Sequence, residues 1–299
     1  MTDASAPPLR PLGVGDIVDR TITLYRASPW LFITLAAIPY LVFAVLSLVL
    51  GGVLFVGATR LPTIDPNADP AALLNLFSAL IPVVIVYGIV ILIVFSAQAA
   101  SLIDAMSKRH LGVPTTVRDS LLNGLRASLR LILAAICAFV AFVGVVIAAF
   151  IVIAILNAVL PSPLVGVGGV IAICVLIFYM VASLMVVPAA VTIEHAGPIR
   201  ALRRSVSLAK GARWRILGLL LLMFVLLFVL ELLLAVVLLT VVGASTGVQL
   251  VAQQVVGVIV NVLWAPIQWG VFTVLYYDLR VRKEAFDLQL AAEAMPRAT

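Results

Sequence analysis

Charge is scarce in this sequence: Asp, Glu, Lys and Arg make up 11% of its 299 residues, whereas apolar residues make up 64%. Soluble domains carry about 25% charged and about 45–50% apolar residues. The mean hydropathy is +1.27, so there are too few charged side chains to cover a soluble core of this size. This shortage excludes an ordinary soluble domain and predicts that lipid surrounds most of the chain.

The side chains that most often build catalytic or metal centres are also rare. There are two histidines, His110 and His195, and two cysteines, Cys137 and Cys174. Both cysteines lie in apolar stretches without a CxxC or Cys/His ligand spacing, which favours packing over metal or redox chemistry. No P-loop, GxSxG, HExxH or dinucleotide fingerprint is present. The sequence therefore predicts no cofactor, no metal site and no enzymatic activity.

Long apolar runs are abundant, and six of them reach the roughly 20 helical residues that a hydrocarbon core of about 30 Å requires. Short, turn-like connections after the first, third and fifth runs pair them as three helical hairpins. Pro39, Pro82, Pro188 and Pro266 fall inside these runs and favour kinks. The runs cover approximately residues 30–57, 72–103, 129–159, 164–193, 214–242 and 249–277.

These runs predict an all-α, polytopic integral membrane protein with six transmembrane helices, and we expect one membrane domain over residues 1–299. Its N-terminal segment occupies 1–28, the transmembrane helices lie within 29–280, and a tail follows at 281–299. Eighteen of the nineteen Lys and Arg residues fall on one side of this topology, and only Arg60 lies on the other. Because cytoplasmic loops are enriched in Lys and Arg, we expect a multi-pass protein of the cell membrane with both termini cytoplasmic, and no nucleic-acid partner.

The hairpins belong to three similar units. Arg26-Ala27-Ser28 and Arg126-Ala127-Ser128 each stand before a span, and Lys210 takes the corresponding place in the third unit. Each unit ends in an acid, which is Asp104, Glu194 or Asp278. This spacing predicts an internal repeat. The exit acids are interpreted as ion-pair partners of neighbouring arginines, with a polar cluster that binds a phosphate headgroup as the alternative.

A short amphipathic segment precedes each hairpin, at residues 14–26, 116–129 and 198–209. Such segments lie in the headgroup plane with basic side chains toward anionic phosphates, although they could equally be orienting elbows without lipid specificity. The candidate headgroup contacts are Arg20, Arg26, Arg126, Arg203, Arg204 and Lys210.

Glu231 is the one ionisable residue well inside a predicted span, which makes it a candidate functional residue. Its expected partners are Gln254, Asn261 and Gln268, which recur every seven residues along the last span. This candidate intramembrane site could form a polar path, or it could serve only interhelical hydrogen bonding.

Three segments carry a resemblance to a known family. They are PLGVGDIVDRTITLYR (11–26), VPAAVTIEHAGPIRALRRSVSLAKGARWRILG (187–218) and LYYDLRVRKEAFDL (275–288). All three resemble the glycerophosphoryl diester phosphodiesterase membrane-domain family of bacterial and archaeal polytopic proteins, apart from Ala285, where glycine is expected. The resemblance implies a stand-alone membrane unit, because the cytoplasmic segments are too short for the (β/α)₈ barrel that carries the hydrolase activity.

We therefore expect a non-catalytic membrane module that interacts with lipids or scaffolds partners. Its expected partners are membrane lipids, anionic ones included, and a second membrane protein or further copies of the chain. The alternative is a small transporter, channel or lipid-translocating protein that uses a polar path around Glu231. A polar cavity reaching Glu231 would favour this alternative, and a dry, sealed bundle would exclude it.

Overall fold

The computed structural model describes residues 11–60, 70–160, 162–242 and 246–286, and within these ranges all regular structure is helical. This confirms the all-α class, and six apolar helical stretches are long enough to cross a membrane. Arg10 and Arg297, which contribute to the predicted orientation, lie outside the described residues. The helices are α1 (Val14–Ala27), α2 (Pro29–Arg60), α3 (Pro70–His110), α4 (Val117–Val159), α5 (Pro163–Leu184), α6 (Val187–Ile193), α7 (Pro198–Ala209), α8 (Arg213–Val242) and α9 (Thr246–Glu284).

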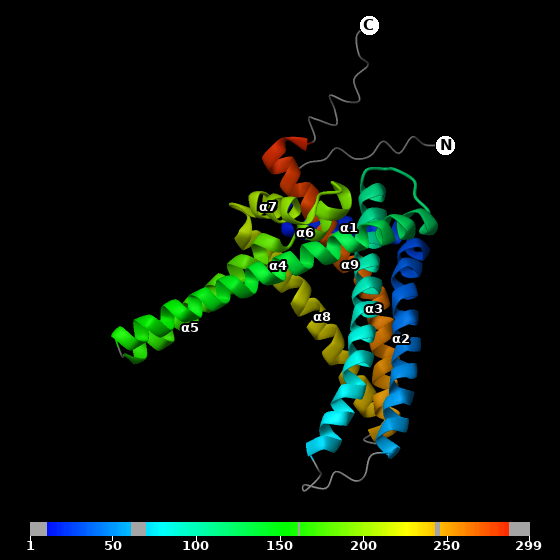
Figure 1. Ribbon diagram of the computed structural model, residues 1–299. Coiled ribbons are helices and arrows are strands. Elements are labelled where there is room, and N and C mark those ends of the chain that lie inside the picture. The colour runs from blue at the N-terminus through cyan, green and yellow to red at the C-terminus, as the bar shows by residue number, and fades with distance from the viewer. Residues whose placement is uncertain (1–10, 61–69, 161, 243–245, 287–299) are drawn as a thin grey trace.

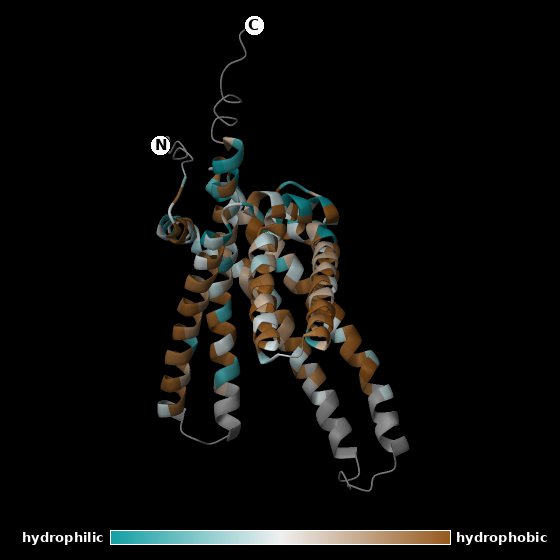
Figure 2. Ribbon diagram, turned by 90° about the vertical axis from the view of Figure 1, so that its left-hand side faces the viewer, coloured by the Kyte–Doolittle hydropathy of each residue, from teal (hydrophilic) through white to brown (hydrophobic). Residues whose placement is uncertain are grey.

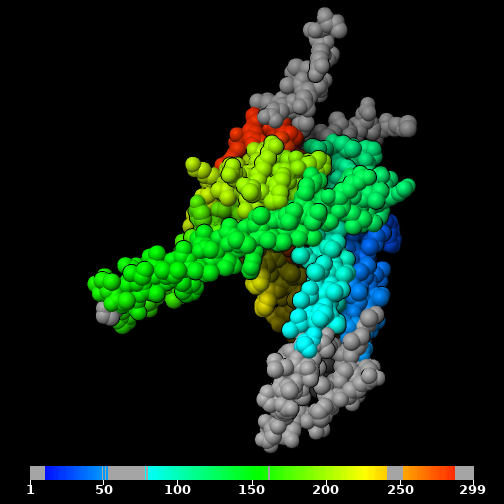
Figure 3. Space-filling model, in the orientation of Figure 1, coloured from blue at the N-terminus to red at the C-terminus, as the bar shows by residue number. Residues whose placement is uncertain are grey.

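The long helices form three hairpins that diverge from one end of the molecule. In Figure 1, α2 and α3 descend together with α9, whereas α4 and α5 run side by side in another direction, and Figure 2 shows the same divergence from the side. The space-filling view shows α8 at the back of a hollow between α4 and α3 (Figure 3). Away from their common end, the apolar helices therefore have few protein neighbours.

The common end is a packed layer that we call the head. It comprises α1, α6, α7, the C-terminal turns of α3 and α9, and the N-terminal turns of α2, α4 and α8 (Figure 1). The largest fully buried side chains cluster here, among them Phe32, Met106, Ile216, Tyr276 and Tyr277. By contrast, Phe139, Phe150 and Leu233 in the outer parts of the hairpins are more than half exposed. The packed core of the protein is therefore concentrated in the head.

The three amphipathic segments adopt different forms. The first is α1, whose apolar face packs on the core through Ile17 and Leu24, so protein covers most of the face that we expected to meet lipid. The second is not a separate helix, since it continues without a break into the span as one 43-residue helix, α4, capped by Thr116. The third is α7, which ends before Gly211, a residue with a φ of +83°. Glycine adopts this left-handed conformation without strain.

The predicted fourth span is interrupted near its head end. Helix α5 ends at Leu184, and the short helix α6 begins at Val187. Pro188 lies in the first turn of α6, where a missing backbone N–H costs little. This proline therefore starts a new helix instead of kinking a continuous one, and α6 belongs to the head.

Two glycines allow helices to approach closely within the head. A Cβ atom on Gly124 of α4 would lie 2.6 Å from the carbonyl oxygen of Ala97 and 2.7 Å from the backbone nitrogen of Ser101, both on α3. A Cβ atom on Gly270 of α9 would lie 2.6 Å from side-chain atoms of both Met106 and Thr21. Small residues serve the same purpose wherever membrane helices pack backbone to backbone.

Candidate functional site

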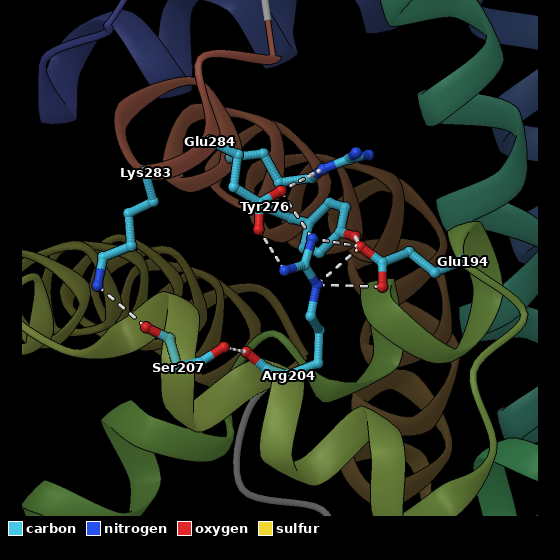
Figure 4. Close-up of polar contacts among 7 residues, drawn as sticks. Glu194, Arg204, Ser207, Tyr276, Lys283 and Glu284 are labelled. Carbon is cyan, nitrogen blue, oxygen red and sulfur yellow. Dashed lines mark hydrogen bonds and ion pairs between the residues drawn. The ribbon is translucent and has the colours of Figure 1, made fainter. Parts of the chain in front are cut away.

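Arg204 connects three segments of the head through a network of charged hydrogen bonds. It extends from α7 and donates to Glu194, which follows α6, from Nε at 2.9 Å and from Nη2 at 2.8 Å. Its Nη2 also donates to Glu284 at the end of α9 at 2.7 Å, and Nη1 donates to the same carboxylate. Tyr276 of α9 donates its hydroxyl to Glu194 (Figure 4).

The electrostatics of this network favour the charged guanidinium. The hydrogen bond to Glu284, with that to Glu194, raises the pKa of Arg204 above its ordinary value, although burial opposes this shift. Arg280 also donates to Glu284, at 3.2 Å. Lys283 completes the junction of α9 with α7 by donating to the carbonyl oxygen of Ser207 at 3.0 Å.

A second network centres on Asp278, whose side chain is fully buried. Arg282 donates to this carboxylate at 3.1 Å, and Arg215 at the start of α8 donates to it from Nη1. The backbone N–H of Leu12 donates to it at 2.7 Å, while the carbonyl oxygen of Leu12 accepts from both arginines. This carboxylate therefore joins the segment before α1 to α8 and α9.

The third exit acid, Asp104, accepts from Lys108 at 2.8 Å and from the Asn123 amide at 3.3 Å. All three exit acids are thus ion-paired: Glu194 and Asp278 pair with arginines, as interpreted from the sequence, whereas Asp104 pairs with a lysine. Glu284 and Tyr276 were not singled out there. Glu284 could have been found from its spacing, since Arg280 and Glu284 lie four residues apart on a helix and can form an ion pair. Nothing in the sequence indicates the role of Tyr276.

Another set of basic side chains on the head remains unpaired. Within the part of the chain that the structure describes, the following residues are exposed and form no ion pair: Arg26, Arg118, Arg126, Arg200, Arg203 and Lys210. Four of them belong to the predicted headgroup contacts. The other two predicted contacts differ, because Arg204 is engaged by Glu194 and Glu284, and Arg20 is half-buried.

Two exposed tryptophans lie at the boundary between the head and the apolar helices. Trp30 in the first turn of α2 is 79% exposed, and Trp214 in the first turn of α8 is 88% exposed. Tryptophan is enriched at the membrane–water interface. The two residues therefore have the position typical of interfacial tryptophans, and Lys210 lies four residues before Trp214.

Arg20 and His110 meet where α1 packs near the end of α3. Burial lowers the pKa of Arg20. The positive charge of the Arg20 guanidinium also interacts electrostatically with the His110 imidazole. The His110 Nδ1 is buried without a hydrogen-bond partner among the described residues, while its ring lies 5.1 Å from that of Tyr277. Because Nδ1 is closed to solvent, this pair belongs to the packing of the head.

The predicted intramembrane site is not assembled among the described residues. Glu231 is exposed on α8 and forms no hydrogen bond or ion pair with any of them. Of its expected partners on α9, Gln254 is exposed, Gln268 is half-buried, and Asn261 donates to the carbonyl oxygen of Gly257 in its own helix at 2.8 Å. An apolar groove lies elsewhere, between α2 and α3, and is lined by Leu46, Pro82 and Val86.

No group of three or more His, Cys, Asp or Glu residues able to hold a metal ion occurs among the described residues. Six long apolar helices below a charged head define the class of the protein, which is a multi-pass helical membrane protein. The chain belongs to a family described as "Domain of unknown function (DUF7847)", whose model matches residues 12–279. No curated protein and no solved structure matched the chain.

Proposed function

We propose that the protein is a non-catalytic membrane module whose head faces the cytoplasm and binds anionic lipid headgroups. The observation that carries this proposal is the division of the basic residues into two sets. Arg204, Arg215 and Arg282 are held by acids inside the head, whereas Arg126, Arg203 and Lys210 are exposed without ion pairs. Exposed Lys and Arg at the membrane surface attract anionic lipid by about 1 kcal/mol each.

The surroundings of the unpaired set support a lipid ligand over a soluble one. On α7, Ile199 is 62% exposed beside Arg200 and Arg203, and on α4, Leu129 is 65% exposed near Arg126. Exposed apolar side chains next to basic ones are typical of helices at the membrane interface. The resemblance to the glycerophosphoryl diester phosphodiesterase membrane-domain family forms part of this proposal, since it implies a membrane unit without the hydrolase.

The transport alternative has less support. A polar path would have to bring Glu231 together with Gln254, Asn261 and Gln268, and among the described residues these side chains share no hydrogen bond with Glu231. The splayed hairpins, on the other hand, do not form the sealed bundle that would exclude transport.

We expect the reconstituted chain to prefer anionic lipid at the two exposed tryptophans. Phosphatidylglycerol brominated near the top of its acyl chains should quench tryptophan fluorescence more than phosphatidylcholine brominated at the same position. Combining Arg203→Gln with Lys210→Gln should reduce this preference about thirtyfold, because two surface charges worth about 1 kcal/mol each are lost. Fluorescence titration in vesicles of mixed composition measures the effect.

The matched control combines Arg203→Lys with Lys210→Arg, which keeps both charges and should keep the preference. Equal quenching of the unchanged chain by the two brominated lipids would contradict the proposal. So would a full preference that survives in the glutamine variant.

A further inference from the structure

The position of Glu231 on α8 is costly for an isolated chain. At 1.5 Å per residue, it lies about 27 Å along the helix axis from Arg213, and residues 232–242 beyond it contain no ionisable side chain. The side chain is exposed, and no described residue donates a hydrogen bond to it. Polar groups within hydrocarbon are expensive unless they are partnered, and none of the described residues partners this carboxyl group, so it is open to a partner from a second chain.

The side chains around Glu231 form a continuous exposed strip, which we call the α8 seam. It consists of Phe224, Phe228, Glu231 and Ala235, spaced by four, three and four residues, and all four are exposed. This spacing keeps them on one face of a helix and matches the seam of left-handed helix pairs. Phe224 and Phe228 are 65% and 55% exposed, and their rings stack with centroids 6.1 Å apart.

The contacts of α8 leave this face uncovered. The residues of α8 that reach the core, Ile216, Leu219 and Met223, lie in its first turns within the head. Farther along, Leu227, Leu234 and Leu238 are only half-exposed and mark the side that packs beside α9. The seam lies about a quarter-turn away from that side, at 100° per residue.

The carboxyl group in the α8 seam favours a second copy of this chain as the binding partner. A neutral carboxyl group both donates and accepts a hydrogen bond, so two of them complement each other without any other residue type. Two copies of one chain cross the membrane in the same direction, which places both Glu231 side chains at the same depth. A two-fold axis along the membrane normal then brings identical patches together, as in most homodimers.

We propose that α8 pairs with α8 of a second copy of this chain through the seam, with the two Glu231 carboxyl groups hydrogen-bonded to each other at its centre. Interhelical hydrogen bonds between polar side chains stabilise helix pairs in membranes. This pairing does not depend on lipid binding by the head, since it involves none of the head's basic residues.

The test is disulfide cross-linking of the full chain in cell membranes, in a background carrying Cys137→Ser and Cys174→Ser. Ala235→Cys should yield a cross-linked dimer under mild oxidation. Leu233→Cys should not, although Leu233 is 59% exposed and lies only two residues away, because it points to nearly the opposite side of the helix. Co-purification of two differently tagged copies without oxidation gives an independent measure.

The role of the carboxyl group is tested in the same assay. Glu231→Leu should reduce dimerisation about tenfold, because the interhelical hydrogen bond is lost. Glu231→Gln should retain it, because an amide also donates and accepts. Equal cross-linking at both cysteine positions, no cross-linking at Ala235→Cys, cross-linking to a different protein, or full dimerisation of Glu231→Leu would each overturn the proposal. None of these outcomes bears on the lipid preference of the head.

Discussion

Replacing Gly124 by alanine is expected to destabilise the protein by about 2 kcal/mol, because overpacking at a close contact forces backbone to move. The added methyl group would lie within 2.7 Å of two backbone atoms of α3 and closer still to the Ser101 hydroxyl oxygen. Helices α3 and α4 would have to separate at this close contact. Unfolding in mixed micelles of mild detergent and SDS measures the change in free energy.

Gly144 provides the matched control for this substitution. It lies on the same helix, but nothing would come within 4 Å of a Cβ atom there. Gly144→Ala should therefore change the free energy of unfolding by less than about 0.5 kcal/mol, as expected for an open surface site. Equal effects of the two substitutions would show that α3 and α4 do not meet as the structure describes.

Replacing Arg204 by glutamine should destabilise the head by about 2 kcal/mol, since it leaves Glu194 and Glu284 without their main counter-charge. The cost is smaller than for a fully buried pair, because 25% of the Arg204 side chain is exposed and water screens part of the interaction. Arg204→Lys should recover only part of the loss, since an ammonium group cannot match the planar fork that reaches both carboxylates. The same micelle titration measures both variants.

The neighbouring Arg203 is the control for Arg204. The same loss of charge at Arg203 should leave the free energy of unfolding nearly unchanged, because this side chain is exposed and forms no ion pair among the described residues. The two substitutions also separate structure from function, since Arg203→Gln should alter the lipid preference of a stable protein. Comparable destabilisation at both positions would contradict the assignment of Arg204 to the internal network.

The sequence was sufficient to predict the helical class and the pairing of spans, because apolar length is a direct requirement of the bilayer. It did not predict that α4 runs unbroken from Val117, since the same amphipathic residues would suit a separate helix. Nor did it predict the new helix at Val187, because a proline can either kink a helix or start one. These boundaries depend on packing within the head.

The candidate site was predictable in kind but not in its particular pairs. Acids beside clustered arginines indicated ion pairs, yet Arg204 meets Glu284 across 80 residues of sequence, and no local pattern records that contact. The divergence of the hairpins was also beyond prediction. Helices such as α8 are apolar on nearly every side, so their sequence does not distinguish a face that meets protein from one that meets lipid.

The two networks of the head also set an order on its assembly during synthesis. Leu12 and Arg215 are made long before Asp278, and Arg204 long before Glu284, yet each needs the later residue as its partner. Because domains form from the N-terminus as the chain is made, Arg204 has only Glu194 as its acid, and Arg215 lacks Asp278, until α9 is made. The head is complete only once α9 is in place, so a chain stopped before this helix would leave Arg215 without its acid and Arg204 with one acid instead of two.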